Sequence, residues 1–195
     1  METTTKKVLV LGGPTGGGKD TIVELLLKEH PQFVRLTTAT TRKPRVYEED
    51  GRDYYFLSND QFKSAIASGD IVEHTYFANR DEYYGTYKPD LDRKIAGGKI
   101  PIAVTDRVGA KYMKEHYGAT TITVIPVPFE SLHERFLSRE PDATEEWIAR
   151  RMENAREEIE LGKGNFDYTI ENVYGKLGET LVGVDEILRK EGYIA

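Results

Sequence analysis

A glycine-rich segment carries the clearest chemical signal in the chain: Gly13-Pro14-Thr15-Gly16-Gly17-Gly18-Lys19-Asp20-Thr21. It fits the pattern GxxxxGK and lies between a short apolar run and an apolar-periodic stretch. Glycines allow backbone N–H groups to turn inward around a phosphate, and the start of the following helix adds partial positive charge. The lysine supplies a mobile point charge. The segment therefore predicts a phosphate-binding loop in which Lys19 contacts the transferable phosphate.

One position of this loop departs from the usual pattern. The lysine is normally followed by Ser or Thr, whose hydroxyl holds Mg²⁺, whereas this chain has Asp20 followed by Thr21. A carboxylate is a good hard-oxygen ligand for Mg²⁺ but adds negative charge beside a triphosphate. Asp20 is thus either the metal ligand, directly or through water, or an acid that weakens nucleotide binding without Mg²⁺. A helix-start acid favoured by the helix dipole is an equally good interpretation.

A second basic group follows in Thr40-Thr41-Arg42-Lys43-Pro44-Arg45. Two arginines three residues apart, with a stiffening proline between them, present two guanidinium forks that suit bidentate capture of a phosphate. The chain as a whole is acidic, with 27 Lys and Arg against 33 Asp and Glu. In such a chain a local basic cluster carries more weight, and we interpret it as a second phosphate site.

Apolar runs of strand type alternate with helical patterns along the chain and must position these groups. Strands are predicted at residues 8–11, 100–104, 121–127 and 168–170. Helical patterns follow them at residues 22–27, 110–117 and 132–137, and in a final helix that ends near Arg189. Strands that alternate with helices indicate an α/β fold, a parallel sheet flanked by helices and joined by right-handed crossovers.

Two segments interrupt this alternation. Residues 37–87 are rich in Thr, Tyr, Arg and Asp, with an alternating segment at 54–57, a helix capped by Ser58 or Asn59, and a strand at 71–77. They predict a small mixed α/β insertion. Residues 140–154 contain a Pro-Asp turn, acids at 145 and 146, and arginines at 150 and 151, an order typical of a helix start.

Composition excludes several classes of protein. The chain has 195 residues, 38% of them hydrophobic and 31% charged, as in an ordinary globular domain and unlike a disordered tail. Its net charge of -6 argues against a protein that coats nucleic acid or an anionic membrane. The absence of cysteine excludes a disulfide scaffold, a thiolate metal site and a cysteine nucleophile. No apolar run is long enough for a signal peptide or a membrane span, so we expect a cytoplasmic protein.

Several motifs in order along the chain resemble the guanylate kinase family. The first motifs are GPTGGGK, TTRKPRVYEEDGRDYYF, the strand end at residues 71–73 and the turn Tyr83-Tyr84-Gly85-Thr86. Later in the chain come the segment with Arg135, Arg139 and Arg151, and then Phe166-Asp167-Tyr168-Thr169-Ile170-Glu171-Asn172. The resemblance spans almost the whole chain, and TTRxPR followed by GxDYxF is its most specific part. It implies a P-loop kinase fold with a GMP-binding insertion and a helical lid.

The resemblance also implies a role for each matching residue. The phosphate of GMP would be held by Arg42, Arg45, Tyr54 and Tyr84. The guanine would be bound by Glu73, with Thr38, Thr86 and Asp106 completing the pocket. A carboxylate suits this task because guanine offers two adjacent donors, N1–H and the 2-amino group. The loop from Gly13 to Thr21 and Asn172 would bind ATP, while Lys19 and the lid arginines Arg135, Arg139 and Arg151 would stabilise the transferring phosphoryl group.

Other positions depart from the family pattern. Val104 stands where an acid is common two residues before Asp106, and Tyr47 replaces a customary glycine. The loop at 78–82 is two residues longer than usual, and the lid has one extra residue near Pro141. Because Asp20 adds a carboxylate where Val104 removes one, we interpret the two changes as a compensation that relocates Mg²⁺.

The sequence predicts one guanylate-kinase-like domain over residues 1–195. Its core comprises 1–36, 88–134 and 155–195, the GMP-binding insertion is 37–87, and the lid is 135–154. The predicted reaction is direct in-line transfer of the γ-phosphoryl group of Mg²⁺-ATP to GMP, with dGMP as a further acceptor. The predicted protein is a monomer or homodimer that binds neither nucleic acid nor membrane.

Two alternatives remain open. The GKD form of the loop also resembles the kinase that phosphorylates ribose 1,5-bisphosphate, although such a sugar offers Glu73 no paired N–H donors. The other is a non-catalytic guanylate-kinase-like domain that binds phosphopeptides in the acceptor site, against which Lys19 and the lid arginines argue.

Overall fold

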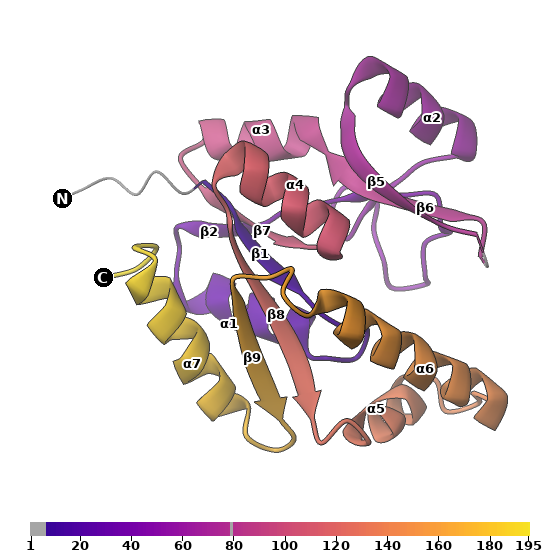
Figure 1. Ribbon diagram of the computed structural model, residues 1–195. Helices are drawn as coiled ribbons and strands as arrows, with labels where there is room; N and C mark the ends of the chain where they lie inside the picture. The colour runs from indigo at the N-terminus through magenta and orange to yellow at the C-terminus, as the bar shows by residue number, and fades with distance from the viewer. Residues whose placement is uncertain (1–6, 79) are drawn as a thin grey trace.

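A parallel five-stranded sheet forms the centre of the molecule in the computed structural model, which describes residues 7–78 and 80–195 (Figure 1). Its strand order is β2-β7-β1-β8-β9, and every neighbouring pair runs parallel. The strands are β1 (Leu9–Gly12), β2 (Phe33–Arg35), β7 (Ile100–Val104), β8 (Thr120–Val127) and β9 (Tyr168–Val173). Residues 1–6 of the predicted core lie outside the described residues.

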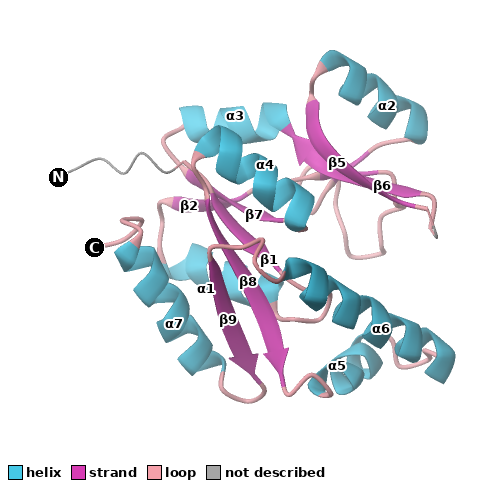
Figure 2. Cartoon of the chain, in the orientation of Figure 1, coloured by secondary structure: helices cyan, strands magenta, loops and turns pink. Residues whose placement is uncertain are grey.

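Helices cover both faces of this sheet (Figure 2). The helices are α1 (Lys19–Glu29), α3 (Lys88–Ala96), α4 (Arg107–Tyr117) and α7 (Leu177–Lys190). Successive side chains of a strand point to opposite faces. Leu9 and Leu11 accordingly pack in a cluster with α1 and α7, whereas Val8 and Val10 pack in one with α3 and α4. The central strand β1 is thus fully buried, and the loop that begins at Gly13 directly follows this packed strand.

A smaller four-stranded sheet lies beside the core, with the order β4-β3-β6-β5. Its elements are β3 (Ala39–Thr40), β4 (Tyr55–Phe56), α2 (Asn59–Ser68), β5 (Ile71–Phe77) and β6 (Glu82–Tyr87). Ser58 is the N-cap of α2 in a capping box with Gln61, which satisfies backbone donors at the helix start. Phe62 of α2 is fully buried against this sheet.

Two further helices form a hairpin that protrudes from the carboxyl end of β8, α5 (Ser131–Arg139) and α6 (Glu145–Gly162). They pack around Leu132, Phe136 and Ala155. Thr144 caps α6 by accepting a hydrogen bond from the backbone N–H of Trp147, at the helix start that the sequence predicts. Helix α6 begins in the predicted lid and continues past residue 154 into the predicted core.

Some expectations from the sequence are confirmed and others are wrong. The parallel sheet and the strands and helices predicted for it are present, with ends that differ by a few residues. The predicted turn at residues 83–86 is instead part of strand β6, which pairs with β3 and β5. A Cβ at Gly85 would lie 2.7 Å from the backbone oxygen of Glu73, so the glycine permits close approach of the two strands.

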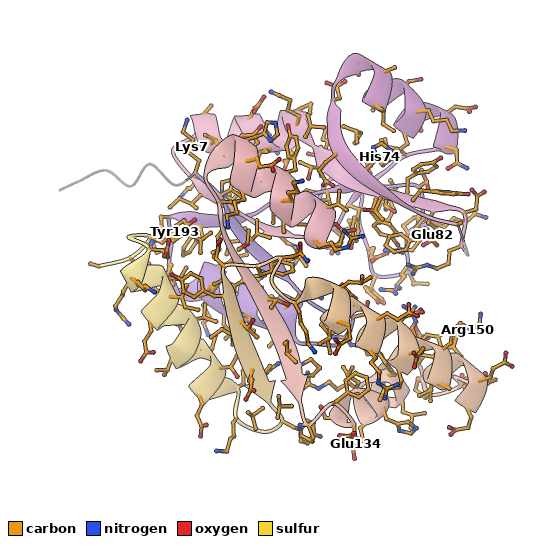
Figure 3. The ribbon with its side chains drawn as sticks, viewed as in Figure 1. Lys7, His74, Glu82, Glu134, Arg150 and Tyr193 are labelled. Atoms are coloured by element: carbon orange, nitrogen blue, oxygen red, sulfur yellow. The ribbon has the colours of Figure 1, made fainter. Side chains whose placement is uncertain are left out.

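The C-terminal segment closes one side of the core through a tyrosine (Figure 3). The Tyr193 hydroxyl donates to the backbone oxygen of Val8 at 2.7 Å and accepts from the backbone N–H of Thr120 at 3.1 Å. It therefore joins the entrances of two neighbouring central strands. Within residues 7–78 and 80–195, no helix has the length and apolar character that crossing a membrane requires.

Candidate active site

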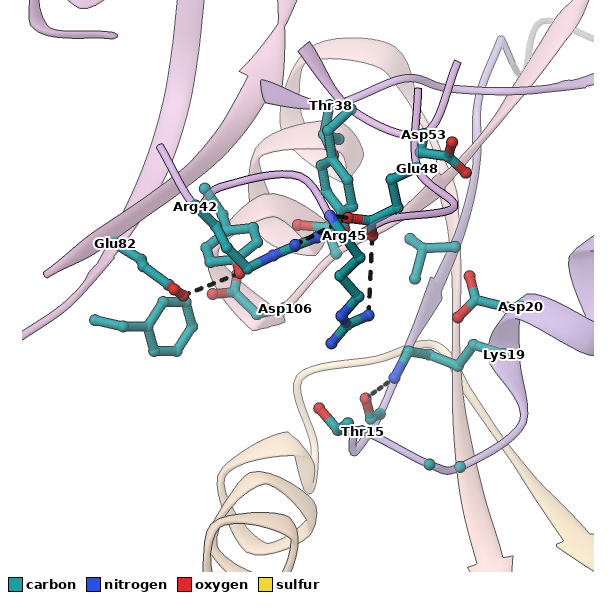
Figure 4. Close-up of a pocket in the computed structure, with 18 of the residues that line it drawn as sticks. Thr15, Lys19, Asp20, Thr38, Arg42, Arg45, Glu48, Asp53, Glu82 and Asp106 are labelled. Carbon is teal, nitrogen blue, oxygen red and sulfur yellow. Dashed lines mark hydrogen bonds and ion pairs between the residues drawn. The ribbon is translucent and has the colours of Figure 1, made fainter. Parts of the chain in front are cut away.

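The core, the insertion and the lid helices face one cavity of about 840 Å³ (Figure 4). It brings together most of the residues that the sequence predicts for substrate binding. The predicted residues on its wall are Gly13, Thr15, Gly16, Gly17, Gly18, Lys19, Asp20, Thr38, Arg42, Arg45, Tyr54, Glu73, Tyr84, Asp106, Arg139 and Arg151. The departing residues Tyr47 and Val104 also line it.

A second, smaller cavity of about 320 Å³ lies on the other side of the phosphate loop. Thr21, Arg135 and Asn172 line it, and Gly16, Gly18 and Arg139 are shared with the larger cavity. Of the predicted lid arginines, Arg135 is therefore the one that the structure leaves out of the larger cavity. Pro14 and Thr86 do not contribute to the described walls of either cavity.

The phosphate loop is shaped by glycines that no other residue could replace without strain. Gly13 has φ +114°, and a Cβ there would lie 2.4 Å from the backbone oxygen of Val124. Gly18 has φ +95° and precedes α1, and its Cβ would lie 2.2 Å from Nδ2 of Asn172. These left-handed conformations favour glycine because it has no side chain to clash. They direct the backbone around the position where a phosphate would lie.

Lys19 is directed at its own loop in this structure. Its Nζ donates to the backbone oxygen of Pro14 at 2.9 Å and also to that of Gly13. Burial lowers the pKa of Lys19 below its ordinary value, while the charges of Glu158 and Asp20 oppose that shift. The loop carbonyls thus keep the ammonium group in place until a stronger acceptor, such as a phosphate oxygen, competes for it.

Three side chains brace the loop from outside. Asn172 donates from Nδ2 to the backbone oxygen of Gly17 at 2.8 Å, and Arg135 donates to that of Gly16 at 2.9 Å. Glu158 of α6 lines the cavity together with Thr15 and Lys19, and its charge acts on Lys19. Burial raises the pKa of Glu158, and the nearby Lys19 partly offsets this. The lid hairpin is therefore connected to the phosphate loop through both of its helices.

The two arginines of the insertion are organised by one buried carboxylate, Glu48. Arg42 donates to both Glu48 oxygens, at 2.9 and 2.8 Å, and the backbone N–H of Arg45 donates at 2.7 Å. These bonds to Arg42 raise the pKa of that guanidinium and lower the pKa of Glu48. Figure 4 shows the Arg45 side chain extended across the cavity toward Thr15 and Lys19. The two predicted phosphate sites consequently line the same cavity.

Aromatic rings and further arginines line the cavity near Arg42 and Arg45. Tyr54 and Tyr84 approach each other with ring centroids 6.0 Å apart, and the Arg42 guanidinium lies 5.4 Å from the centre of the Tyr54 ring. Arg80, which the sequence reasoning did not single out, also lines the cavity. The pKa of Arg151 is lowered first by burial and then by the charges of Arg80 and Arg45. Arg45, Arg80 and Arg151 come from separate segments and lie close enough for their charges to interact. An anion bound between them would lower their mutual repulsion.

A pair of acids lies at the base of the insertion. Glu73 accepts from the Thr86 hydroxyl at 2.6 Å, and Asp106 accepts from the Thr75 hydroxyl at 2.6 Å. Asp106 also caps α4 by accepting from two backbone N–H groups. Burial first, and then the charge of Asp106, raise the pKa of Glu73 to about 7. Asp106 therefore accepts more hydrogen bonds from the protein than Glu73 does. Glu73 is the acid better suited to accept hydrogen bonds from a ligand.

Asp20 lies on the cavity wall with its side chain 54% exposed, where its Oδ1 accepts from Nη2 of Arg35 at 2.5 Å. A single accessible carboxylate fits Mg²⁺, which is usually bound through one or two carboxylates together with substrate phosphates. The described residues contain one group of three potential metal ligands, Glu29, His30 and Asp185, which is not on the cavity wall.

Several residues of the site could not be identified from the sequence. Glu48, Thr75 and Glu158 have no motif, because their roles come from contacts between segments far apart in the chain. Arg35 is the last residue of the short strand β2, and no motif singled it out. The only usable hint was at Glu48, which lies three residues after Arg45 of the predicted second phosphate site.

Comparisons with known proteins agree on one family. A family model described as guanylate kinase matches residues 5–191. The guanylate kinase of Gloeobacter violaceus is 39% identical over 186 residues, covering 95% of this chain and 88% of that protein. The guanylate kinase of Trichormus variabilis is 38% identical over 167 residues, covering 85% and 82%. A crystal structure of guanylate kinase from Anaplasma phagocytophilum is similar, with TM-score 0.74 and 27% identity, covering 98% of this chain and 88% of that one.

Proposed function

The chain belongs to the guanylate kinase family, and we propose that it transfers the γ-phosphoryl group of ATP to GMP, giving ADP and GDP. The observation that carries this proposal is the larger cavity. The phosphate loop with Lys19, the Arg42–Arg45 pair and Glu73 all line this one cavity. This arrangement suits two phosphate groups held toward each other, one of them attached to a base with two adjacent N–H donors. The acceptor dGMP belongs to the same proposal.

The acceptor residues position GMP. Arg42 and Arg45, with the hydroxyls of Tyr54 and Tyr84, would hold its phosphate and offset the repulsion between two anions. Ionised Glu73 would accept from N1–H and the 2-amino group of guanine, and Thr38 would line the base pocket. The Thr86 hydroxyl donates to Glu73 in this structure, so its proposed part in the pocket is to orient that carboxylate.

The donor side requires no protein nucleophile, because in-line transfer depends on positioning and on neutralising charge. Lys19 would leave the loop carbonyls for the transferring phosphate, and Arg139 and Arg151 would approach it as the lid closes. Arg135 and Asn172 would hold the loop and border the ATP nucleoside in the smaller cavity. Closure would exclude water and limit ATP hydrolysis.

Mg²⁺ is the proposed metal, with Asp20 as its protein ligand. Asp20 would hold the metal on the cavity wall, and a bound Mg²⁺ would supply positive charge that neutralises part of the charge of the phosphates. A cytoplasmic location, and a monomeric or homodimeric state, remain predictions from the sequence.

A coupled assay for ADP formation tests the proposed reaction. ATP and Mg²⁺ are offered with GMP, dGMP, AMP, UMP or ribose 1,5-bisphosphate, and Lys19→Ala serves as the inactive control. We expect GMP to be the best acceptor and Lys19→Ala to lower turnover by several orders of magnitude while the circular dichroism spectrum is retained. A preference for the sugar bisphosphate would contradict the assignment of the acceptor site, and turnover that survives Lys19→Ala would contradict the role of the phosphate loop.

A further inference from the structure

An ion pair on the wall of the larger cavity connects the phosphate loop to the edge of the central sheet. Asp20 is the second residue of α1, and Arg35 is the last residue of β2. The Nη2 of Arg35 lies 2.5 Å from Oδ1 of Asp20, and the two side chains are 32% and 54% exposed. Both residues line the cavity that contains the phosphate loop. The pair is therefore in contact with the space that a nucleotide would occupy.

The position of Asp20 raises an electrostatic difficulty for nucleotide binding. Its carboxylate directly follows Lys19, the cation that the loop offers to a phosphate. A negative charge there repels a polyphosphate and offsets part of the attraction of Lys19 and of the helix start. A neighbouring cation that stays in place without metal would remove this repulsion.

Arg35 is placed to be that cation. Its charge also acts on Asp53 and Tyr54 of the insertion. Asp53, however, already has a closer partner of its own in Arg52, whose Nη2 lies 2.7 Å away. Asp20 is the acid to which Arg35 makes its short contact, and Arg35 is held in the central sheet, where it pairs with Ile102 of β7.

We propose that Arg35 is a positioning residue for nucleotide binding, which neutralises Asp20 and holds its carboxylate toward the edge of the sheet. A phosphate loop with an acid after its lysine can then accept ATP even before a metal binds. This inference rests on the proposed function, because it assumes that the loop binds ATP. It adds Arg35, which lies outside the phosphate loop, to the residues that determine the affinity of the loop for ATP.

A double-mutant cycle tests the proposal by direct binding, apart from catalysis. The full-length protein and the variants Arg35→Gln, Asp20→Ser and Asp20→Ser/Arg35→Gln are titrated with ATP by calorimetry in EDTA. We expect Arg35→Gln alone to weaken metal-free ATP binding roughly three- to tenfold, and to have little effect when Asp20 is already serine. Arg35→Lys, which retains the charge, should recover most of the lost affinity. Arg189→Gln on α7 removes the same charge away from the cavity and should leave binding unchanged.

Two results would overturn the inference. One is an unchanged affinity in Arg35→Gln, and the other is an equal loss from Arg35→Gln with and without Asp20. Either result, in a parent protein that binds ATP, would leave the proposed function intact and reject the role of Arg35 alone. A parent protein that binds no ATP, with or without Mg²⁺, would reject both. Thermal melting of each variant separates loss of binding from loss of folding.

Discussion

At the scale of single residues, the proposed choice of GMP as acceptor rests on the contrast between Glu73 and Asp106. Both are carboxylates at the base of the insertion, but Asp106 is engaged by a helix start and by Thr75. Glu73 is bonded to the Thr86 hydroxyl, which fixes its orientation and still leaves it acceptor capacity. The same residue type thus caps a helix at one position and, in the proposed function, accepts hydrogen bonds from the ligand at the other.

Replacing Glu73 by Gln should separate the two substrates. The amide presents a donor where guanine also presents donors, so the KM for GMP should rise roughly ten- to a hundredfold. ATP affinity, measured by calorimetry, should change by no more than about twofold, because the loop is a separate wall of the cavity. Glu115→Gln, on the exposed side of α4, is the matched control. Equal losses for GMP and ATP would argue against guanine binding by Glu73.

The raised pKa of Glu73 predicts a pH dependence of GMP binding. Since the ionised form accepts the guanine donors, kcat/KM for GMP should fall as pH drops through about 7. Well below this pH, kcat/KM for GMP should fall by close to tenfold for each pH unit. Glu73→Gln should lose this inflection while retaining those of other groups, as pH profiles of both proteins would reveal. A wild-type profile that is flat between pH 6 and 8 would contradict an acid with this pKa in the binding step.

The raised pKa of Glu73 affects the stability of the protein in the opposite direction to GMP binding. A carboxyl whose pKa is raised on folding binds more protons in the folded state than in the unfolded state. The stability that Glu73 contributes by this proton binding is fully present below pH 4.5, the ordinary pKa of Glu, and is lost as the pH rises through about 7, its pKa in the folded protein. Binding of GMP and stability of the free protein therefore respond to Glu73 in opposite directions over this range.

At the scale of elements, the loop between β3 and β4 has its shape because Glu48 joins both arginines. Sequence reasoning could identify Arg42 and Arg45 from their spacing, but not the acid that orients them, because any nearby Glu or Asp was an equal candidate. Buried strands and helices of the core were predictable from hydrophobic periodicity. The strands β2 and β3 were not, since three and two residues are too few to show a period.

Substituting Gln for Glu48 should loosen this loop. Glu48 is 6% exposed and Arg42 15%, so the change leaves a largely buried guanidinium without its charged partner. We expect the free energy of unfolding to fall by about 1 to 2 kcal/mol, less than for a fully buried pair because the loop is close to solvent. The KM for GMP should rise roughly three- to tenfold from lost preorganisation.

Urea denaturation and steady-state kinetics would measure these two effects. Glu49→Gln is a suitable control, because Glu49 is the next residue and its side chain is 70% exposed. A lower KM for GMP in Glu48→Gln would mean that the carboxylate competes with substrate phosphate for Arg42 more than it organises the loop.

At the scale of the whole molecule, the cavity is formed by three parts that the chain visits in turn. The parallel core supplies the phosphate loop, the insertion supplies the residues proposed to bind the acceptor, and the hairpin of α5 and α6 supplies arginines (Figure 1). The general plan could be predicted from the alternation of patterns and from the family resemblance. The contacts across the cavity could not, because they depend on how the parts are placed in space.

Trp147 should report closure of these parts, since it is the single tryptophan of the chain. It lies on α6, edge-on to Phe136, with the Arg151 guanidinium 4.8 Å from its ring centre. When ATP and GMP are both bound, Arg151 should move from the ring toward phosphate, and the Trp147 emission should change. A non-hydrolysable ATP analogue with GMP should give a larger change than either ligand alone.

Variants of two adjacent arginines make this fluorescence experiment specific. Arg151→Ala should reduce the response to the ligand pair, whereas Arg150→Ala should retain it, because Arg150 is exposed and pairs with Glu146 (Figure 3). A full response to GMP alone would show that the hairpin moves without the donor nucleotide.

The central position of β1 has a consequence for how the protein is made. Both neighbours of this strand come much later in the chain, β7 at residues 100–104 and β8 at 120–127. At about 5 to 20 residues per second, the ribosome takes on the order of ten seconds to supply them after β1. During that interval Leu9, Val10 and Leu11 form an apolar segment with no sheet to join. The nascent chain should therefore be a client of chaperones that bind short apolar segments, even though the finished protein buries this strand completely.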